Sequence, residues 1–185
     1  MHTIGWYKPG KRIVAIDKMS RVRYTLTAKY GKLDFPAELS PQQMLRMGVF
    51  EGKYLTDCRG EFPKEWFERA KLSPKRPDPS LNEFGVKSRQ SLQTWRKNGW
   101  IPVAPGDPDV RGWFQWYCRY FVGRRIPDID LIQIGRWRRF SRHRAQVVAS
   151  VGRSRDPPKT RAEKRSHRPK QRQALLQWAY NPFRP

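Results

Sequence analysis

The stretch RGWFQWYCRYFV, residues 111–122, decides the fold. When this stretch is drawn as an α-helix, its large aromatic side chains cover nearly the whole circumference of the helix. Arg111, Gln115 and Arg119 make one narrow polar stripe at helical spacing. Because a helix that is apolar almost all round is buried, we predict that this helix is the central core element. The polar stripe predicts either a group that reads a nucleobase or an internal hydrogen-bond network.

Signals for further helices lie on both sides of this stretch. Ser40-Pro41-Gln42-Gln43 combines an N-cap, a proline at the first helical position and a glutamine two residues later, and Gly48 ends that helix. Capping residues and apolar periodicity predict four more helices, over residues 62–72, 89–98 (capped by Ser88), 128–150 and 171–180. The fold class is therefore mainly α, with five or six helices around residues 111–122.

The N-terminal segment lacks helical periodicity. Val22, Tyr24 and Leu26 alternate with polar residues, which is typical of a strand, and residues 13–16 supply a hairpin partner around residues 17–20. An extended basic arm fits the same residues equally well. The predicted organisation is a basic arm over 1–36, a helical core over 37–151, a flexible basic linker over 152–170 and a C-terminal helix over 171–185 that docks on the core.

The charge of the chain points to a polyanionic partner. The 185 residues carry 39 Lys and Arg against 16 Asp and Glu, for a net charge of +23. Residues 136–172 hold 14 basic residues against two acidic ones. Solubility alone needs a net charge of only about 2–8 for a small domain, whereas Lys and Arg bind the phosphates of DNA and RNA. An anionic membrane surface is the other physical candidate.

Composition also excludes several classes of protein. No apolar run approaches the roughly 18 residues of a membrane span, and two cysteines do not make a disulfide framework. The first sixteen residues lack the apolar stretch of a secretory leader, so we expect an intracellular protein with reduced Cys58 and Cys118. Phosphate-loop, dinucleotide-binding and zinc-protease motifs are absent from the sequence, and we expect neither a metal site nor a cofactor.

Two groups of residues are candidates for nucleic-acid contact. The helix over 89–98 shows only Leu92 and Trp95 as apolar contacts, which fits a recognition helix as well as an ordinary surface helix. The long helix over 128–150 carries arginines opposite its apolar stripe, which fits a phosphate-binding face. With the polar stripe, the candidates are Arg89, Gln90, Arg96, Lys97, Arg111, Gln115, Arg119, Arg124, Arg125, Arg136, Arg138, Arg139 and Arg142.

Catalytic candidates are few. Glu51, Asp57 and Glu61 lie close together in the sequence, and carboxylates near a nucleic-acid channel hold Mg²⁺ or activate water in some enzymes. His143 is a candidate base. The aromatic residues 113–121 also suit the stacking of an unpaired or flipped base, although core packing explains them better.

The segment DVRGWFQWYCR at residues 109–119, followed by GRR at 123–125, resembles a widespread family of small basic proteins with no assigned activity. Further resembling stretches are GVFEGKY at 48–54, EWF at 65–67, LQTW at 92–95, GW at 99–100 and the tail at 172–178. They span most of residues 39–180. The resemblance implies that the last helix belongs to the folded unit, and it transfers no catalytic residue.

We predict a nucleic-acid-binding protein, of an accessory or repair type, that binds DNA in preference to RNA. The alternatives are an enzyme that processes nucleic acid, as a nuclease or a base-processing enzyme, and a component of an RNA-rich particle. The high net charge, together with the absence of a catalytic motif, favours a binding protein over an enzyme.

Overall fold

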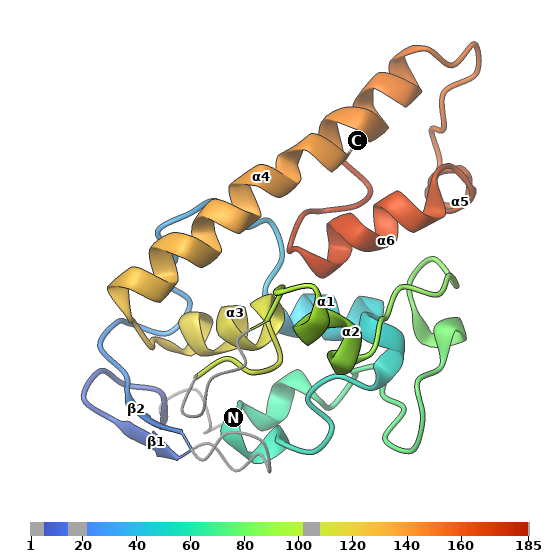
Figure 1. The fold of residues 1–185 in the computed structure, drawn as a ribbon. Helices are drawn as coiled ribbons and strands as arrows, with labels where there is room; N and C mark the ends of the chain where they lie inside the picture. Colours follow the sequence, from blue (N-terminus) through green and yellow to red (C-terminus); the bar gives the residue numbers. More distant parts are fainter. Residues whose placement is uncertain (1–5, 15–21, 102–107, 185) are drawn as a thin grey trace.

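The computed structural model describes residues 6–14, 22–101 and 108–184. The described chain is mainly helical, with one small antiparallel hairpin near the N-terminus, as predicted (Figure 1). The hairpin strands are β1 (Arg12–Val14) and β2 (Arg23–Thr25). The helices are α1 (Pro41–Met47), α2 (Leu92–Lys97), α3 (Trp113–Val122), α4 (Pro127–Gly152), α5 (Arg161–Ser166) and α6 (Pro169–Gln177).

The hairpin belongs to the folded unit. Ile13 lies opposite Tyr24 in the antiparallel register, and both side chains are buried. After β2, Leu26 forms an isolated bridge with Arg124 and is fully buried. The alternative of an extended arm is therefore wrong for the described part of this segment. The predicted turn over 17–20 lies outside the described residues.

The aromatic helix α3 is the central core element that the sequence predicts. All of its residues from Trp113 to Tyr120 are buried. Its polar aromatic atoms are satisfied inside the protein, since Trp116 Nε1 donates to Asp130 at 2.8 Å and Tyr117 donates to the Leu39 carbonyl at 2.7 Å. These bonds remove the cost of burying indole and phenol groups, so most of these rings form the core.

Gly123 joins the end of α3 to the hairpin. It ends the helix in the left-handed conformation, with φ of 117°. Its carbonyl accepts from the amides of Thr27 and Ala28 at 2.9 and 3.0 Å. A Cβ here would collide with the Ala28 carbonyl oxygen, so only glycine permits this close approach.

Helix α4 runs along one edge of the molecule and extends past the core, with α6 beside it (Figure 1). Trp137 on the inner face of α4 stacks on Tyr180, with 4.8 Å between the ring centroids. Leu175 and Leu176 of α6 are fully buried, which confirms that the C-terminal helix docks on the core. Within the described ranges, no helix has both the length and the apolar character needed to cross a membrane.

The predicted helix over 62–72 is wrong. The structure has only a 3₁₀ turn over Lys64–Trp66. The amides of Trp66 and Phe67 bond the carbonyls three residues back, each at 3.0 Å. Trp66 is buried and stacks on Phe62, with 5.6 Å between the centroids. This packing fixes the tighter turn and outweighs the preference for an α-helix.

The predicted flexible linker over 152–170 is also wrong, because it contains α5. Thr160 and Glu163 form a capping box: the Glu163 amide donates to Thr160 Oγ1 at 3.2 Å, and the Thr160 amide donates to Glu163 Oε2 at 2.9 Å. Arg161 and Arg165 each donate to Glu83 at 2.7 Å. The pattern Thr-x-x-Glu was the available signal for this helix.

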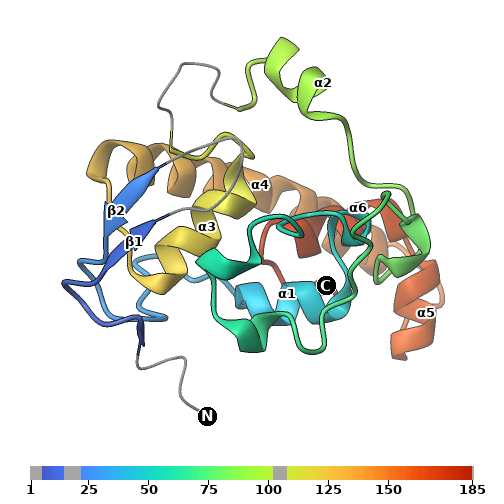
Figure 2. The same cartoon turned by 90° about the horizontal axis from the view of Figure 1, so that it is seen from below.

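Helix α2 is shorter than predicted and begins later. Ser91 rather than Ser88 caps it, accepting from the Thr94 amide at 3.1 Å. It lies apart from the other helices (Figure 2). No other α-helix lies between Met47 and Leu92, so the chain does not form the helix pair of a helix-turn-helix motif here.

Candidate nucleic-acid interface

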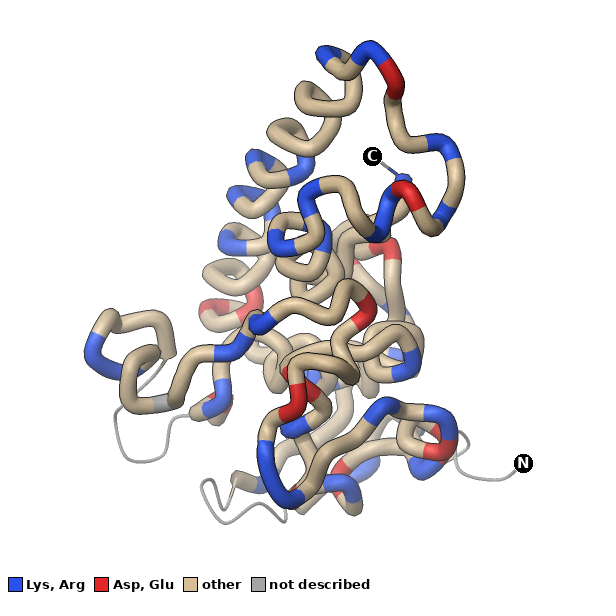
Figure 3. Tube along the Cα trace, turned by 90° about the vertical axis from the view of Figure 1, so that its right-hand side faces the viewer, with Lys and Arg blue, Asp and Glu red and all other residues tan. Residues whose placement is uncertain are grey.

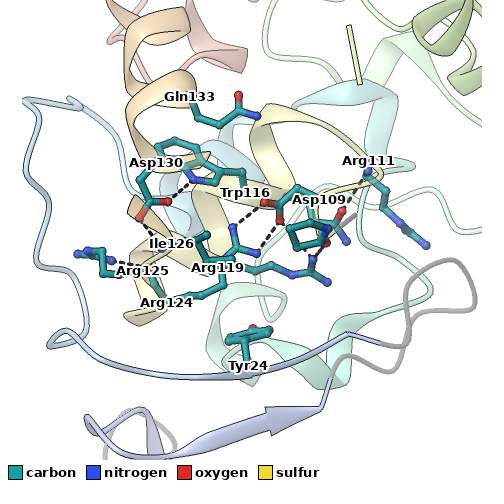
Figure 4. A network of polar contacts seen from close by, with 12 residues as sticks. Tyr24, Asp109, Arg111, Trp116, Arg119, Arg124, Arg125, Ile126, Asp130 and Gln133 are labelled. Carbon is teal, nitrogen blue, oxygen red and sulfur yellow. Dashed lines mark hydrogen bonds and ion pairs between the residues drawn. The ribbon is translucent and has the colours of Figure 1, made fainter. Parts of the chain in front are cut away.

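Two arginines of the predicted interface lie inside the protein (Figure 4). Arg119 Nε and Nη2 donate to the two oxygens of Glu61 at 2.6 and 3.1 Å. Arg124 donates to both oxygens of Asp109 at 2.9 and 2.6 Å, and Arg119 Nη1 reaches the same carboxylate at 3.2 Å. The two arginine side chains are 0% and 1% exposed. They have no access to a phosphate, so we assign them a structural role.

The electrostatics of this network favour its charged form. Burial alone would lower the pKa of Arg119, but the hydrogen bonds and charge of Glu61 outweigh burial and raise that pKa above its ordinary value. Tyr24 adds a hydrogen bond of 2.8 Å to Glu61. Glu61 is therefore committed to an internal ion pair, which removes it from the catalytic candidates.

The rest of the polar stripe, Gln115 on α3 and Arg111 before its N-cap, is also internal. The fully buried Gln115 accepts from the Arg111 amide at 3.0 Å. The Arg111 guanidinium donates to both oxygens of Asp57 at 2.5 and 2.6 Å, and these bonds lower the pKa of the Asp57 carboxyl. Of the two alternatives, the internal hydrogen-bond network is confirmed.

The contacts of Arg125 are with the end of α3 and with the segment before α1. Its guanidinium lies 3.5 Å from the centre of the Tyr120 ring and donates to the Tyr120 carbonyl at 2.7 Å. Asp34 lies 3.6 Å from its Nε. These contacts tie the end of α3 to the segment before α1, so we place Arg125 outside the interface.

The predicted acidic cluster does not form. The buried Glu51 accepts from the amides of Ser88 and Arg89 at 2.9 and 3.1 Å, while Asp57 and Glu61 pair with different arginines. His143 lies on α4 with its ring 4.3 Å from that of Phe140. In the part of the chain that the structure describes, no group of three or more His, Cys, Asp or Glu is placed to hold a metal ion. The two cysteines are free and buried, and burial raises the pKa of the Cys118 thiol.

The outer face of α4 carries the exposed arginines. Arg138, Arg139 and Arg142 are exposed, and none of them pairs with a carboxylate of the described residues. The sequence holds seven arginines and no acid between Asp130 and Asp156. Arginines recur along α4 beyond its acidic first turn (Figure 3). We name Arg138, Arg139 and Arg142 the outer arginines.

Helix α4 also lines an aromatic pocket of about 550 Å³, through Arg136, Phe140 and His143. Its walls come from α3, α4, α6 and the segment that carries α2. The aromatic lining residues are Phe50, Tyr54, Trp95, Trp100, Trp113, Phe114, Phe140 and Trp178, and the polar ones are Ser88, Gln90, Arg136, His143 and Gln177. The volume lies in the range of small-molecule sites, and the mixture of apolar walls with a few polar groups is typical of them.

A glycine lets the α2 segment close one side of the pocket. Gly112, with φ of 86°, precedes α3. A Cβ there would lie 2.8 Å from Ile101 Cγ2 and 3.3 Å from a ring carbon of Trp95. Across the pocket, Arg136 Nη1 donates to the Trp100 carbonyl at 3.3 Å. These contacts hold Trp95 and Trp100 over the body of the protein.

The other predicted interface residues divide between this pocket and the surface. Arg136 lines the pocket and leads on to the outer arginines, and Gln90 lines it from the α2 segment. Arg96 and Lys97 are exposed on α2. No local sequence pattern indicates that Trp100, Phe140 and Trp178 line one pocket, because they are far apart in the chain and only the fold brings them together.

Comparisons of the chain with protein-family models, curated proteins and solved structures find no match. The resemblance of the 109–125 segment to a family of small basic proteins therefore stays a prediction.

Proposed function

We propose that this protein binds nucleic acid, with the outer arginines of α4 contacting backbone phosphates. The observation that carries the proposal is the exposure of Arg138, Arg139 and Arg142 along a helix stretch without acids, beside an aromatic pocket. Guanidinium groups bind phosphate through paired hydrogen bonds and release condensed counterions when they do so.

The internal ion pairs support the proposal because they leave the net positive charge on the surface. Each buried pair, such as Arg119 with Glu61, takes one positive and one negative charge away from the surface. The net charge of +23 therefore remains on the outside of the molecule. A surface this cationic draws polyanions and speeds their association at low salt.

A charge-matched pair of variants tests the proposal. In the test variant, Arg138, Arg139 and Arg142 become Gln. In the control, the exposed Lys64, Arg69 and Lys75 become Gln, which removes the same charge from another part of the surface. Binding of single-stranded and duplex DNA, and of the matching RNA, is measured by fluorescence anisotropy between about 50 and 200 mM salt.

We expect the test variant to bind more weakly and the slope of log affinity against log salt to fall by about 2–3, one phosphate contact per arginine. We expect the control to keep nearly the full slope. Equal losses in both variants would show a general charge effect without a specific face. Absence of salt-dependent binding in the unmodified protein would overturn the proposal. Cleavage of the strands in the presence of Mg²⁺ would replace the proposal with its alternative, an enzyme that processes nucleic acid.

A further inference from the structure

A small second hollow opens beside the aromatic pocket. Its volume is about 50 Å³, and it shares Tyr54, Gln90 and Trp95 with the larger pocket. Its other lining residues are Lys53, Arg89 and Arg111, of which Arg111 is already paired with Asp57. An apolar, ring-lined space and a cation-lined space thus lie side by side with shared walls.

Two rings of the pocket have no aromatic ring partner within the described part of the chain. Phe50, Tyr54, Trp113, Phe114, Phe140 and Trp178 each stack on other aromatic rings. Trp95 and Trp100, in contrast, stack on no other aromatic ring of the described residues, and Trp100 is 50% exposed. Both indoles line the pocket, and an indole that lines a pocket is a platform for another flat ring.

The polar groups of the pocket match the edge of a nucleobase. Gln90 is exposed at the junction of the two spaces. Among the described residues, Gln177 makes long contacts: its Oε1 accepts from the Phe50 amide at 3.4 Å and from Gln173 Nε2 at 3.5 Å, and its Nε2 donates to the Ser88 carbonyl at 3.5 Å. Carboxamides both donate and accept, as the edges of bases require.

We propose that the pocket and the hollow form one site for a single unpaired nucleotide, with its base against Trp95 and Trp100 and its phosphate beside Lys53 and Arg89. This rests on the proposed function and names the part of the nucleic acid that the site holds. Arg136 lies in the pocket on α4, so the strand continues from the site onto the outer arginines. Charge complementarity selects a nucleotide over an uncharged aromatic ligand.

The test compares three single strands of about 12 sugar-phosphate units. The first carries all its bases, the second carries none, and the third carries a single base at its centre. Each is made with deoxyribose and, in a parallel set, with ribose, which separates DNA from RNA as the source of the nucleotide. Affinities of the unmodified protein and its variants are measured at one low salt concentration.

We expect the single-base strand to bind about tenfold more tightly than the strand without bases, because one base–aromatic stack is worth this much. Trp100→Ala removes that difference and leaves the affinity for the baseless strand unchanged. Trp6→Ala is the matched control, since Trp6 is 56% exposed and lies outside the pocket. Trp95→Leu is a second variant with the same expectation, and thermal melting checks that each variant is folded.

Lys53→Gln with Arg89→Gln tests the phosphate half of the site. We expect this double variant to weaken binding of a nucleoside 5′-monophosphate, followed by tryptophan fluorescence, and to leave binding of the uncharged nucleoside unchanged. Equal affinity of the unmodified protein for the baseless and single-base strands would overturn the nucleotide site while the salt-dependent proposed function stood. Failure of every strand to bind would overturn both.

Discussion

The protein has two sets of arginines, one buried and paired with carboxylates and one exposed on α4. Arg119 and Arg124 lie inside the fold, where Glu61 and Asp109 neutralise them. The outer arginines lie on α4 without a carboxylate among the described residues to pair with. In the sequence both sets look alike, as basic residues on predicted helices or in the turn between them. The difference teaches that in a strongly cationic chain the position of the acids, more than the count of the bases, separates structural from functional charge.

The inner arginines also show why the core tolerates so many charges. Arg119 and Arg124 each pair with a carboxylate, and Tyr24 supplies a further donor to Glu61. A buried pair of this kind adds little net stability compared with apolar packing, but the loss of one partner leaves a charge stranded in a low-dielectric interior. The network therefore joins the hairpin, the 3₁₀ turn before Phe62 and α3 in one arrangement.

The largest expected effect comes from breaking an inner pair. Arg119→Met removes the guanidinium and leaves Glu61 buried without its main partner. We expect the free energy of unfolding to fall by about 3–5 kcal/mol, measured by urea denaturation followed by tryptophan fluorescence. A loss below about 1 kcal/mol, the usual size for an exposed ion pair, would contradict the structural role of the inner arginines.

An intermediate effect is expected at Glu38, which binds one arginine of α4 and the C-terminal segment. It accepts from Arg144 at 2.8 Å, from the Asn181 amide at 2.7 Å and from Arg184 at 3.0 Å. Burial opposes ionisation, but the Asn181 amide and Arg144 outweigh it, so the pKa of Glu38 lies below its ordinary value of 4.5. Ionised Glu38 thus stabilises the folded state above the unfolded pKa.

Glu38→Gln should therefore cost about 1–2 kcal/mol at neutral pH, as expected for the loss of hydrogen bonds to a charged group. As the pH falls through the lowered pKa of the folded state, the unmodified protein loses this advantage and the two unfolding curves converge. Urea denaturation at a series of pH values measures the difference. A gap that stays constant down to strongly acidic pH would show that Glu38 acts by packing rather than by its charge.

Local patterns predict much of this fold and little of the site. The aromatic stretch 113–121 indicates a buried helix because its rings surround the axis, and the structure confirms it. The capping signals at Ser40 also predict α1 correctly. The helix over 62–72 fails because the stacking of Phe62 on Trp66, a tertiary contact, decides the turn.

The site is harder to predict because it is assembled from segments far apart in the chain. Trp100, Phe140 and Trp178 meet only when α4 and α6 pack beside the α2 segment. The pairing of Arg124 with Asp109 has the same origin, since fifteen residues separate them and helical spacing does not bring them together. Sequence reasoning therefore identified the cationic character of the protein, but it assigned to the nucleic-acid interface several arginines that the structure places inside the protein.

The smallest expected effect on stability belongs to the outer arginines. Changing Arg138, Arg139 and Arg142 to Gln removes no ion pair among the described residues and no core contact, because the three side chains are exposed. It also reduces repulsion within a chain of net charge +23. We expect the free energy of unfolding to change by less than about 0.5 kcal/mol, measured by the same urea denaturation. A variant that keeps its stability but binds nucleic acid weakly separates the two sets of arginines, whereas a loss comparable with that of Arg119→Met would show that α4 needs these charges to fold.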